Sequence, residues 1–136
     1  MAKRCWLVKS EPDVYSLDDL ERAGSTSWDG VRNYQARNNL RAMKAGDEVL
    51  FYHSNATPPG VVGIATVSRE AYDDGDPRWS VVDLAFVTRL PNMVSLDDIK
   101  AQRSLAGMEL VKNSRLSVQR VTGPELQGVK KMGGLK

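Results

Sequence analysis

Short runs of apolar residues, some of them alternating with polar ones, predict more strands than helices in this chain. Residues 79–88 alternate over a whole strand length, with Val82, Leu84 and Phe86 on one face and Val81, Ala85 and Val87 on the other. We expect Pro91 to close this longer strand, because proline lacks the amide hydrogen that a sheet needs. The five predicted strands are residues 5–9, 48–53, 60–67, 79–88 and 116–121.

Helices are predicted where a capping residue precedes an amphipathic run. Ser16 and Ser95 each precede a Leu-Asp-Asp sequence, and Thr122 precedes Gly-Pro-Glu, which are all typical helix starts. Asn33 caps a fourth predicted helix, residues 34–44, which Gly46 ends. The polar stretch 25–30 contains Asp-Gly and is predicted as a turn.

The order of these elements indicates the fold class. Strands outnumber helices and are joined mostly by short loops, which favours an α+β fold with a mainly antiparallel sheet. Closure of that sheet into a barrel would remove its exposed edges, although periodicity does not distinguish a barrel from an open sheet. With 136 residues, the chain fits a single domain, residues 1–136.

Composition is that of an ordinary globular protein, with 41% hydrophobic and 26% charged residues. No apolar run approaches the roughly 20 residues that span a bilayer, and Lys9 interrupts the only apolar run near the start. We therefore expect neither a membrane anchor nor a signal peptide. The single cysteine, Cys5, excludes an internal disulfide framework, favours a cytoplasmic location and is expected to pack as a small apolar residue.

The distribution of charge says more than the net charge of +2. Two stretches, residues 31–45 and 110–124, carry cations and no acid before Glu125. They could form a local positive face for nucleic acid, or they could be ordinary solvated surface, and charge alone leaves both open. Their cations are Arg32, Arg37, Arg41, Lys44, Lys112, Arg115 and Arg120.

Signatures of catalysis are missing from the sequence. One histidine and one cysteine cannot make a zinc site, and no glycine-rich phosphate loop is present. His53 and Ser54 are neighbours on an extended segment, so their side chains point apart and make a poor base and nucleophile. We expect no catalytic residues, no metal and no cofactor.

Aromatic and hydrogen-bonding residues instead gather in predicted loops and strand ends. Trp28 lies in a polar turn, Trp79 opens the long strand, and residues 52–55 (YHSN) end another strand. A flat ring between aromatic faces, with donors and acceptors at its edge, is how proteins hold an isolated base. Trp6 is expected in the core, Trp79 fits either the core or a pocket, and His53 could simply bond a strand-end carbonyl.

Five segments of the chain closely resemble the EVE domain family. They are residues 5–12 (CWLVKSEP), 28–38 (WDGVRNYQARN), 51–55 (FYHSN), 59–63 (PGVVG) and 114–119 (SRLSVQ). The resemblance implies a PUA-like β-barrel surrounded by short helices and related to the YTH domain. It also implies a monomeric, non-catalytic module, widespread in bacteria, that binds nucleic acid carrying a modified base, above all a modified cytosine in DNA.

The resemblance also assigns candidate roles to individual residues. Trp28 would stack on the base, and the remaining base-pocket candidates are Lys9, Ser10, Asn33, Tyr52, His53, Ser54, Asn55 and Trp79. Candidate phosphate contacts are Arg32, Arg37 and Arg115, with Arg115 and Ser117 on one face of the last strand. Two alternatives stay open: Asn33 only caps a helix, and Arg37 is paired with an acid.

Two other functions compete with base reading. Small PUA-like amidohydrolases act on modified nucleosides, and Lys9 with Ser10 or Glu11 would be the candidate machinery. A modification-independent RNA-binding domain is the second. The chain also departs from the family pattern, since residues 73–77 replace a longer insertion, so its specificity could differ.

Overall fold

The structure is a computed structural model and describes residues 4–73, 75–113 and 115–135. Asp74, in the short bridge 73–77, and Ser114 lie outside the described residues. The strands are β1 (Cys5–Ser10), β2 (Ser25–Trp28), β3 (Glu48–His53), β4 (Gly60–Asp73), β5 (Ser80–Ser95) and β6 (Val118–Val121). The helices are α1 (Leu17–Ala23), α2 (Tyr34–Ala42), α3 (Leu96–Ala101), α4 (Glu109–Lys112) and α5 (Gly123–Met132), with a 3-10 turn, η1 (Arg103–Leu105).

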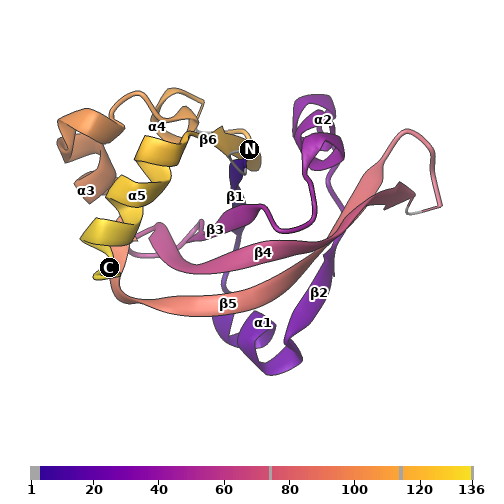
Figure 1. Cartoon of the computed structure of the whole chain (residues 1–136), viewed down its shortest axis with the longest axis horizontal. Helices are drawn as coiled ribbons and strands as arrows, with labels where there is room; N and C mark the ends of the chain where they lie inside the picture. Colours follow the sequence, from indigo (N-terminus) through magenta and orange to yellow (C-terminus); the bar gives the residue numbers. More distant parts are fainter. Residues whose placement is uncertain (1–3, 74, 114, 136) are drawn as a thin grey trace.

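The strands described here form one curved sheet in the order β2-β5-β4-β3-β1-β6 (Figure 1). Strands β1 and β3 pair in parallel, whereas the other four pairings are antiparallel. Helices α3, α4 and α5 gather at one end of the molecule. Helix α1 lies beside β2, at the bottom of the molecule as drawn in Figure 1. The prediction of an α+β fold with a mainly antiparallel sheet is confirmed.

The expected barrel does not close completely, because β2 and β6 remain the two edges of the sheet. Helix α2 packs against both β5 and β6 and bridges them. The Asn39 side-chain amide donates to the Val118 carbonyl of β6 over 2.7 Å, and the Arg41 Nε donates to the Ser80 hydroxyl of β5 over 2.9 Å. A helix thus spans the gap that strand pairing would have to fill in a closed barrel.

Both faces of the central strands are buried, which explains why β1 is apolar without alternation. Trp6 and Val8 belong to one core cluster, while Cys5 and Leu7 belong to a second cluster on the opposite face. Trp6 is 1% exposed, and Cys5 is buried with its thiol pKa raised mainly by desolvation. The sequence predictions that Trp6 and Cys5 pack in the core are confirmed.

The predicted helix starts are confirmed by their capping hydrogen bonds. Ser16 and Thr122 each form a reciprocal capping box, and Ser95 accepts a hydrogen bond from the amide of Asp98. The Asn33 side chain accepts from the Ala36 amide over 2.9 Å, although α2 ends at Ala42 rather than at residue 44. These local signals could be found in the sequence because the bonding partners lie within four residues.

Three strand predictions are wrong. The stretch 25–28 is strand β2 rather than a turn, because its residues pair with 82–85 of β5. Strand β5 continues through Pro91 to Ser95, and an irregular register between Val61 and Gly63 of β4 accommodates the proline. The last strand begins at Val118, so Arg115 and Ser117 precede it instead of sharing one of its faces.

Candidate functional site

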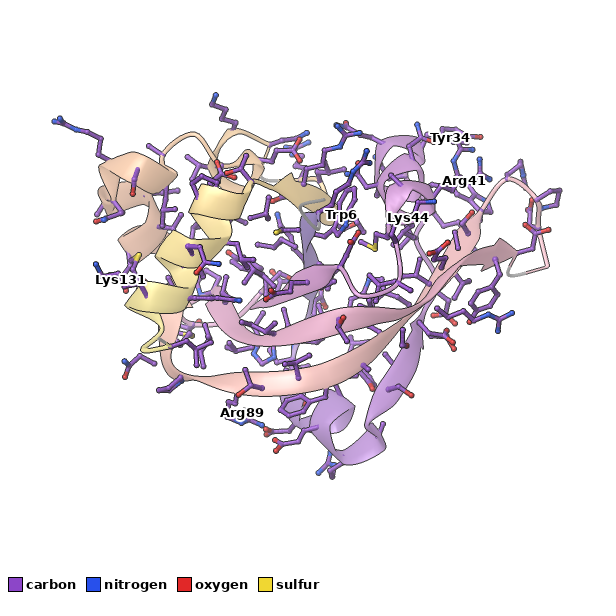
Figure 2. The ribbon with its side chains drawn as sticks, in the orientation of Figure 1. Trp6, Tyr34, Arg41, Lys44, Arg89 and Lys131 are labelled. Carbon is purple, nitrogen blue, oxygen red and sulfur yellow. The ribbon has the colours of Figure 1, made fainter. Side chains whose placement is uncertain are left out.

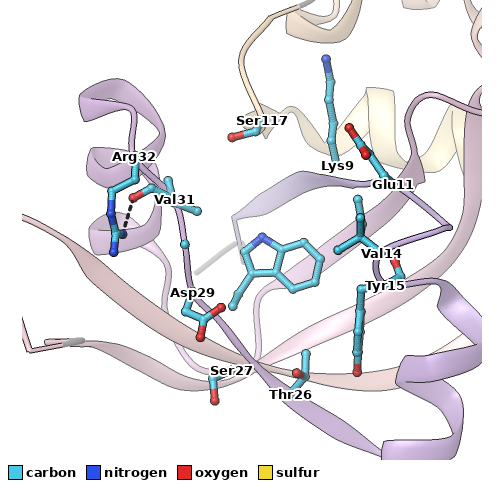
Figure 3. Close-up of a pocket in the computed structure, with 13 residues that line it drawn as sticks. Lys9, Glu11, Val14, Tyr15, Thr26, Ser27, Asp29, Val31, Arg32 and Ser117 are labelled. Carbon is cyan, nitrogen blue, oxygen red and sulfur yellow. Dashed lines mark hydrogen bonds between the residues drawn. The ribbon is translucent and has the colours of Figure 1, made fainter.

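A pocket of about 620 Å³ opens where β1, β2 and the segment before α2 meet (Figure 3). Its lining comes from residues 9–11 at the end of β1, residues 14–15 before α1, the continuous stretch 26–32 and Ser117. A cavity of this size is large enough for a single nucleobase or nucleoside. Most of the WDGVRN sequence therefore forms one wall of a single cavity.

The aromatic wall of the pocket is Trp28, which ends the edge strand β2 and is half-buried. Tyr15 and Phe51 contact the indole edge to face, with ring centroids at 6.4 and 5.6 Å and interplanar angles of 81° in both cases. Two perpendicular rings thus hold the orientation of the indole. Trp28 is a rigid flat surface exposed to the cavity.

Hydrogen-bonding groups line the β1 side of the pocket. The Ser10 hydroxyl donates to the Tyr15 carbonyl, which leaves its oxygen as an acceptor towards the cavity. The Asn55 amide donates to Glu11 Oε1 over 3.0 Å and so fixes the carboxylate at the pocket mouth. Lys9 also lines the pocket; its ammonium group lies 5.7 Å from the centroid of the Tyr52 ring, and burial lowers its pKa from the usual value of 10.5. The cavity thus combines hydrogen-bond acceptors with an aromatic wall.

The backbone shapes the remaining walls. Gly30 has φ of 75°, a conformation that favours glycine, and it lets the chain turn between Trp28 and the start of α2. The Lys9 amide donates to the Ser117 carbonyl over 3.0 Å, which keeps residue 117 beside the end of β1. The turn at Gly30 was expected from the Asp-Gly sequence, whereas the backbone hydrogen bond between Lys9 and Ser117 has no signal in the sequence.

Of the nine predicted base-contact residues, Lys9, Ser10 and Trp28 line the pocket, whereas six do not. Tyr52 is 3% exposed and belongs to the core cluster on the far face of β3, because alternate residues of a strand face opposite sides. The Ser54 amide continues β3 by donating to the Ser10 carbonyl, and Asn55 acts on the pocket through Glu11.

His53 lies on the same face of β3 as Phe51, with the two ring centroids 5.8 Å apart, but it does not line the pocket. The Leu17 amide, at the start of α1, donates to His53 Nε2 over 3.1 Å. The sequence alternative was that His53 donates a hydrogen bond to a strand-end carbonyl. His53 does form a structural hydrogen bond, but it accepts from a backbone amide and does not donate to a carbonyl. The imidazole accepts this bond only in its neutral form.

We therefore predict that His53 makes folding stability dependent on pH. Burial is the largest cause that lowers the pKa of His53 below 6.5, with Asp18 opposing and Arg89 adding to the shift. Below pH 6.5 the unfolded chain takes up the proton first, so stability is full above that pH and falls as the pH drops. One proton limits this slope to about 1.4 kcal/mol per pH unit.

Denaturant unfolding at pH 5, 6 and 7 measures this dependence. The variant His53→Gln keeps an acceptor for the Leu17 amide without titrating, so its stability is expected to change less over this range. An identical pH dependence in the two proteins would contradict the role assigned to His53.

The predicted residues Trp79, Arg32 and Arg37 lie together with Tyr34 in a second group, beside α2 and mostly outside the pocket. Trp79 stacks on Tyr34, with ring centroids 5.0 Å apart and planes 18° apart. The Arg32 guanidinium lies 5.2 Å from the Trp79 ring, and that of Arg37 lies 4.8 Å from the Tyr34 ring. We call Arg32, Trp79, Tyr34 and Arg37 the cation–aromatic stack. Arg32 also lines the pocket, so the stack begins at the pocket edge.

Tyr34 of the cation–aromatic stack lies on α2, near Arg41 and Lys44 (Figure 2). Arg37 donates to the Arg78 carbonyl over 3.1 Å, and Arg41 donates to the Pro77 carbonyl over 2.9 Å. These bonds tie the short β4–β5 connection to α2. Arg37 also bonds Asn38, so the predicted acid partner is replaced by a carbonyl and an amide.

Asn33 and Arg115 are both exposed, and neither lines the pocket. Asn33 caps α2, as its structural alternative proposed. Arg115 lies in the turn before β6, two residues from the pocket residue Ser117. Its phosphate contact stays a prediction.

Sequence reasoning missed several pocket residues. Tyr15, Val14, Thr26, Ser27, Asp29 and Val31 were not selected, although Asp29 and Val31 flank Gly30 in the recognised WDGVRN segment. Their adjacency to Trp28 was the available signal. No sequence signal marked Tyr15 as a pocket residue, because its contact with Trp28 depends on how the segment before α1 packs.

Among residues 4–73, 75–113 and 115–135, no three His, Cys, Asp or Glu side chains are grouped to hold a metal ion. Within the same ranges, no helix is both long enough and apolar enough to cross a bilayer.

Comparison with known proteins finds close relatives over nearly the whole chain. Protein Atu2648 from Agrobacterium tumefaciens is 48% identical, with 97% of this chain and 94% of that chain covered and a TM-score of 0.94. The human THYN1 protein, solved in complex with 5-methylcytosine-containing DNA, is 35% identical, with 98% and 99% covered and a TM-score of 0.91.

Thymocyte nuclear protein 1 of Rattus norvegicus is 39% identical over 156 aligned residues, which cover 88% of this chain and 69% of the relative. That alignment is longer than this whole chain, so the relative carries residues without a counterpart here. A YTH domain from Zygosaccharomyces rouxii, 16% identical with a TM-score of 0.61, shares the fold alone. Residues 4–132 match the EVE domain profile, and the chain belongs to the EVE domain family.

Proposed function

We propose that this protein is a non-catalytic reader that holds one modified base, a modified cytosine in DNA, in the pocket walled by Trp28. The observation that carries the proposal is a rigid half-buried indole facing a cavity with polar groups at its edge. The human relative's complex with 5-methylcytosine-containing DNA supports it, since that chain matches this one over almost its full length.

The pocket chemistry fits this ligand. Stacking of a base on an aromatic side chain contributes roughly 1–3 kcal/mol and tolerates any flat ring. Ser10 and Glu11 offer acceptors to the base edge, and a base must leave the helical stack to reach them. The cation–aromatic stack begins at the pocket edge, so a sugar-phosphate chain that leaves the cavity on this side would pass the Arg32 guanidinium.

Binding titrations with matched oligonucleotides test the proposed function. The strands carry cytosine, 5-methylcytosine, 5-hydroxymethylcytosine, adenine or N6-methyladenine at one position, as DNA and as RNA, at fixed salt. We expect a preference of tenfold or more, about 1.4 kcal/mol, for a modified cytosine in DNA. Equal affinity for modified and unmodified strands with steep salt dependence would instead indicate modification-independent binding.

A second candidate function is hydrolysis of a modified nucleoside. One observation favours it: Lys9 and Glu11 line the same pocket, and burial lowers the pKa of Lys9 towards that of a useful nucleophile or base. Incubation of the protein with modified nucleosides, followed by chromatography, tests it. Turnover that disappears in Lys9→Ala would replace the reader by an enzyme, whereas an unchanged nucleoside supports the reader.

We predict that Arg32 contacts phosphate and contributes to affinity without base selectivity. Its guanidinium lies at the pocket edge over Trp79. Arg32→Ala is therefore expected to weaken binding of modified and unmodified strands by the same factor. The slope of log K against log salt concentration should fall in magnitude by about 1, the value for one lost phosphate contact.

Arg103→Ala is the matched control, because Arg103 is an exposed arginine of η1, outside the pocket lining and the cation–aromatic stack. It removes the same charge and should leave the salt slope unchanged. A loss of selectivity in Arg32→Ala, rather than a uniform loss of affinity, would mean that Arg32 reads the base.

A further inference from the structure

Three chemically different groups follow one another along the β1 side of the pocket. Lys9 and Glu11 are separated by one residue at the extended end of β1, so both side chains leave the same side of the chain. The Val14 amide donates to the Glu11 carbonyl over 2.9 Å, which brings Val14 next to Glu11. The order is therefore ammonium, carboxylate and apolar side chain, as Figure 3 shows.

Glu11 is held in place more firmly than its exposure suggests. Its carbonyl accepts from the amides of both Val14 and Tyr15, over 2.9 and 2.8 Å, and Pro12 restricts the backbone of Glu11, the residue that precedes it. Its carboxylate accepts from Asn55 through Oε1 over 3.0 Å. No hydrogen bond found among the described residues uses the second oxygen, Oε2. A fixed carboxylate therefore keeps one oxygen for a ligand.

Val14 completes this edge as an apolar neighbour of the carboxylate. Its side chain is 77% exposed, which is unusual for a residue that packs in a core, and it lines the pocket beside Tyr15. A methyl group of a bound ring that contacts Val14 would become buried on binding. Burial of one methyl group favours binding by its hydrophobic transfer free energy.

This order of groups matches one edge of 5-methylcytosine. Around the pyrimidine ring, the 5-methyl group is followed by the 4-amino group and then by the acceptor nitrogen N3. With the methyl group against Val14, the amino group donates to Glu11. Thymine carries the same methyl group but an oxygen at position 4, which would face the carboxylate without a hydrogen between them.

We propose that Glu11, positioned by Asn55, makes this pocket selective for a 4-amino-5-methylpyrimidine over thymine. The proposal rests on the proposed function, since it assumes that the pocket binds a base. It assigns Glu11 as a specificity-determining residue that contacts the amino group, with Val14 contacting the methyl group.

Single-stranded oligonucleotides carrying 5-methylcytosine, cytosine or thymine at one position test the proposal. The wild-type protein is expected to bind 5-methylcytosine at least tenfold more tightly than thymine. In Glu11→Gln the amide can donate to the oxygen of thymine as well as accept from the amine, so the ratio should fall below threefold. Thermal unfolding confirms that each variant is folded.

Asp13→Asn is the matched control, because Asp13 is an exposed aspartate two residues from Glu11 that does not line the pocket, and the change removes the same charge. It is expected to keep the wild-type ratio of 5-methylcytosine to thymine. The selectivity role of Glu11 is overturned if Glu11→Gln keeps that ratio, if Asp13→Asn abolishes it, or if the wild-type protein does not discriminate against thymine.

The cytosine strand separates this inference from the proposed function. A wild-type preference for 5-methylcytosine over cytosine without discrimination against thymine overturns the role of Glu11 and leaves the reader standing. Equal binding of cytosine, 5-methylcytosine and 5-hydroxymethylcytosine overturns the reader itself.

Discussion

Trp28→Ala is expected to weaken binding of the modified base by about 5- to 150-fold, which corresponds to the roughly 1–3 kcal/mol of one base–aromatic stacking contact. The indole is the aromatic wall of the pocket, and Tyr15 and Phe51 fix its orientation edge to face. Alanine leaves the polar edge of the cavity unchanged but removes the surface on which the base lies. Titration with modified and unmodified strands measures the effect.

Two further variants separate lost stacking from lost folding. Trp28→Phe keeps a ring in contact with Tyr15 and Phe51, so it should lie between the wild-type protein and Trp28→Ala in affinity. Trp79→Ala removes a tryptophan of the cation–aromatic stack outside the pocket, so it should weaken modified and unmodified strands alike. The pocket assignment fails if a folded Trp28→Ala keeps the wild-type affinity for the modified strand.

The largest expected effect on stability comes from Asp47, a carboxylate that is only 3% exposed. Its Oδ2 accepts from the Trp6 indole over 3.0 Å and from the Lys44 amide over 2.9 Å. Asp47→Ala leaves the buried indole N–H without this acceptor and removes the bond that holds the turn between α2 and β3. We expect a loss of about 3 kcal/mol in unfolding free energy, or roughly 10 °C in Tm.

Calorimetry or denaturant unfolding measures this loss. Asp47→Asn keeps an acceptor oxygen, so its stability should lie between those of the wild-type protein and Asp47→Ala. Asp73→Ala removes an exposed aspartate at the end of β4 and should stay within about 0.5 kcal/mol of the wild-type protein. Equal losses in Asp47→Ala and Asp73→Ala would show that the buried network contributes nothing.

The features predicted correctly from the sequence are those set by near neighbours in the chain. The caps Ser16, Asn33, Ser95 and Thr122 bond amides within four residues, and Trp6 lies in an apolar run. Strand β2 was missed because its residues are mostly polar and its pairing with β5 joins segments more than fifty residues apart. Tertiary pairing overrode the local turn preference there.

Among the candidate site residues, too, the correct predictions rest on local sequence signals and the wrong ones depend on tertiary structure. Trp28 and Lys9 were found because a tryptophan in a polar segment and a recognised motif mark them, and both line the pocket. Tyr52 and His53 were grouped with them because they are adjacent to polar loop residues in sequence. The alternation of β3 instead sends Tyr52 to the far core, and the start of α1 bonds the His53 imidazole. Only the register of β3 against β1 and β4 decides those directions.

The most direct test of the central claim, that Trp28 receives the modified base, uses the indole N–H signals of the three tryptophans in a ¹H–¹⁵N NMR spectrum. Trp6 is buried and bonded to Asp47, Trp79 lies in the cation–aromatic stack, and Trp28 lines the pocket. On titration with a strand containing 5-methylcytosine, the Trp28 signal should shift most and saturate, whereas Trp6 should not move. A shift of Trp79 with an unmoved Trp28 would place the bound nucleic acid outside the pocket and contradict the account.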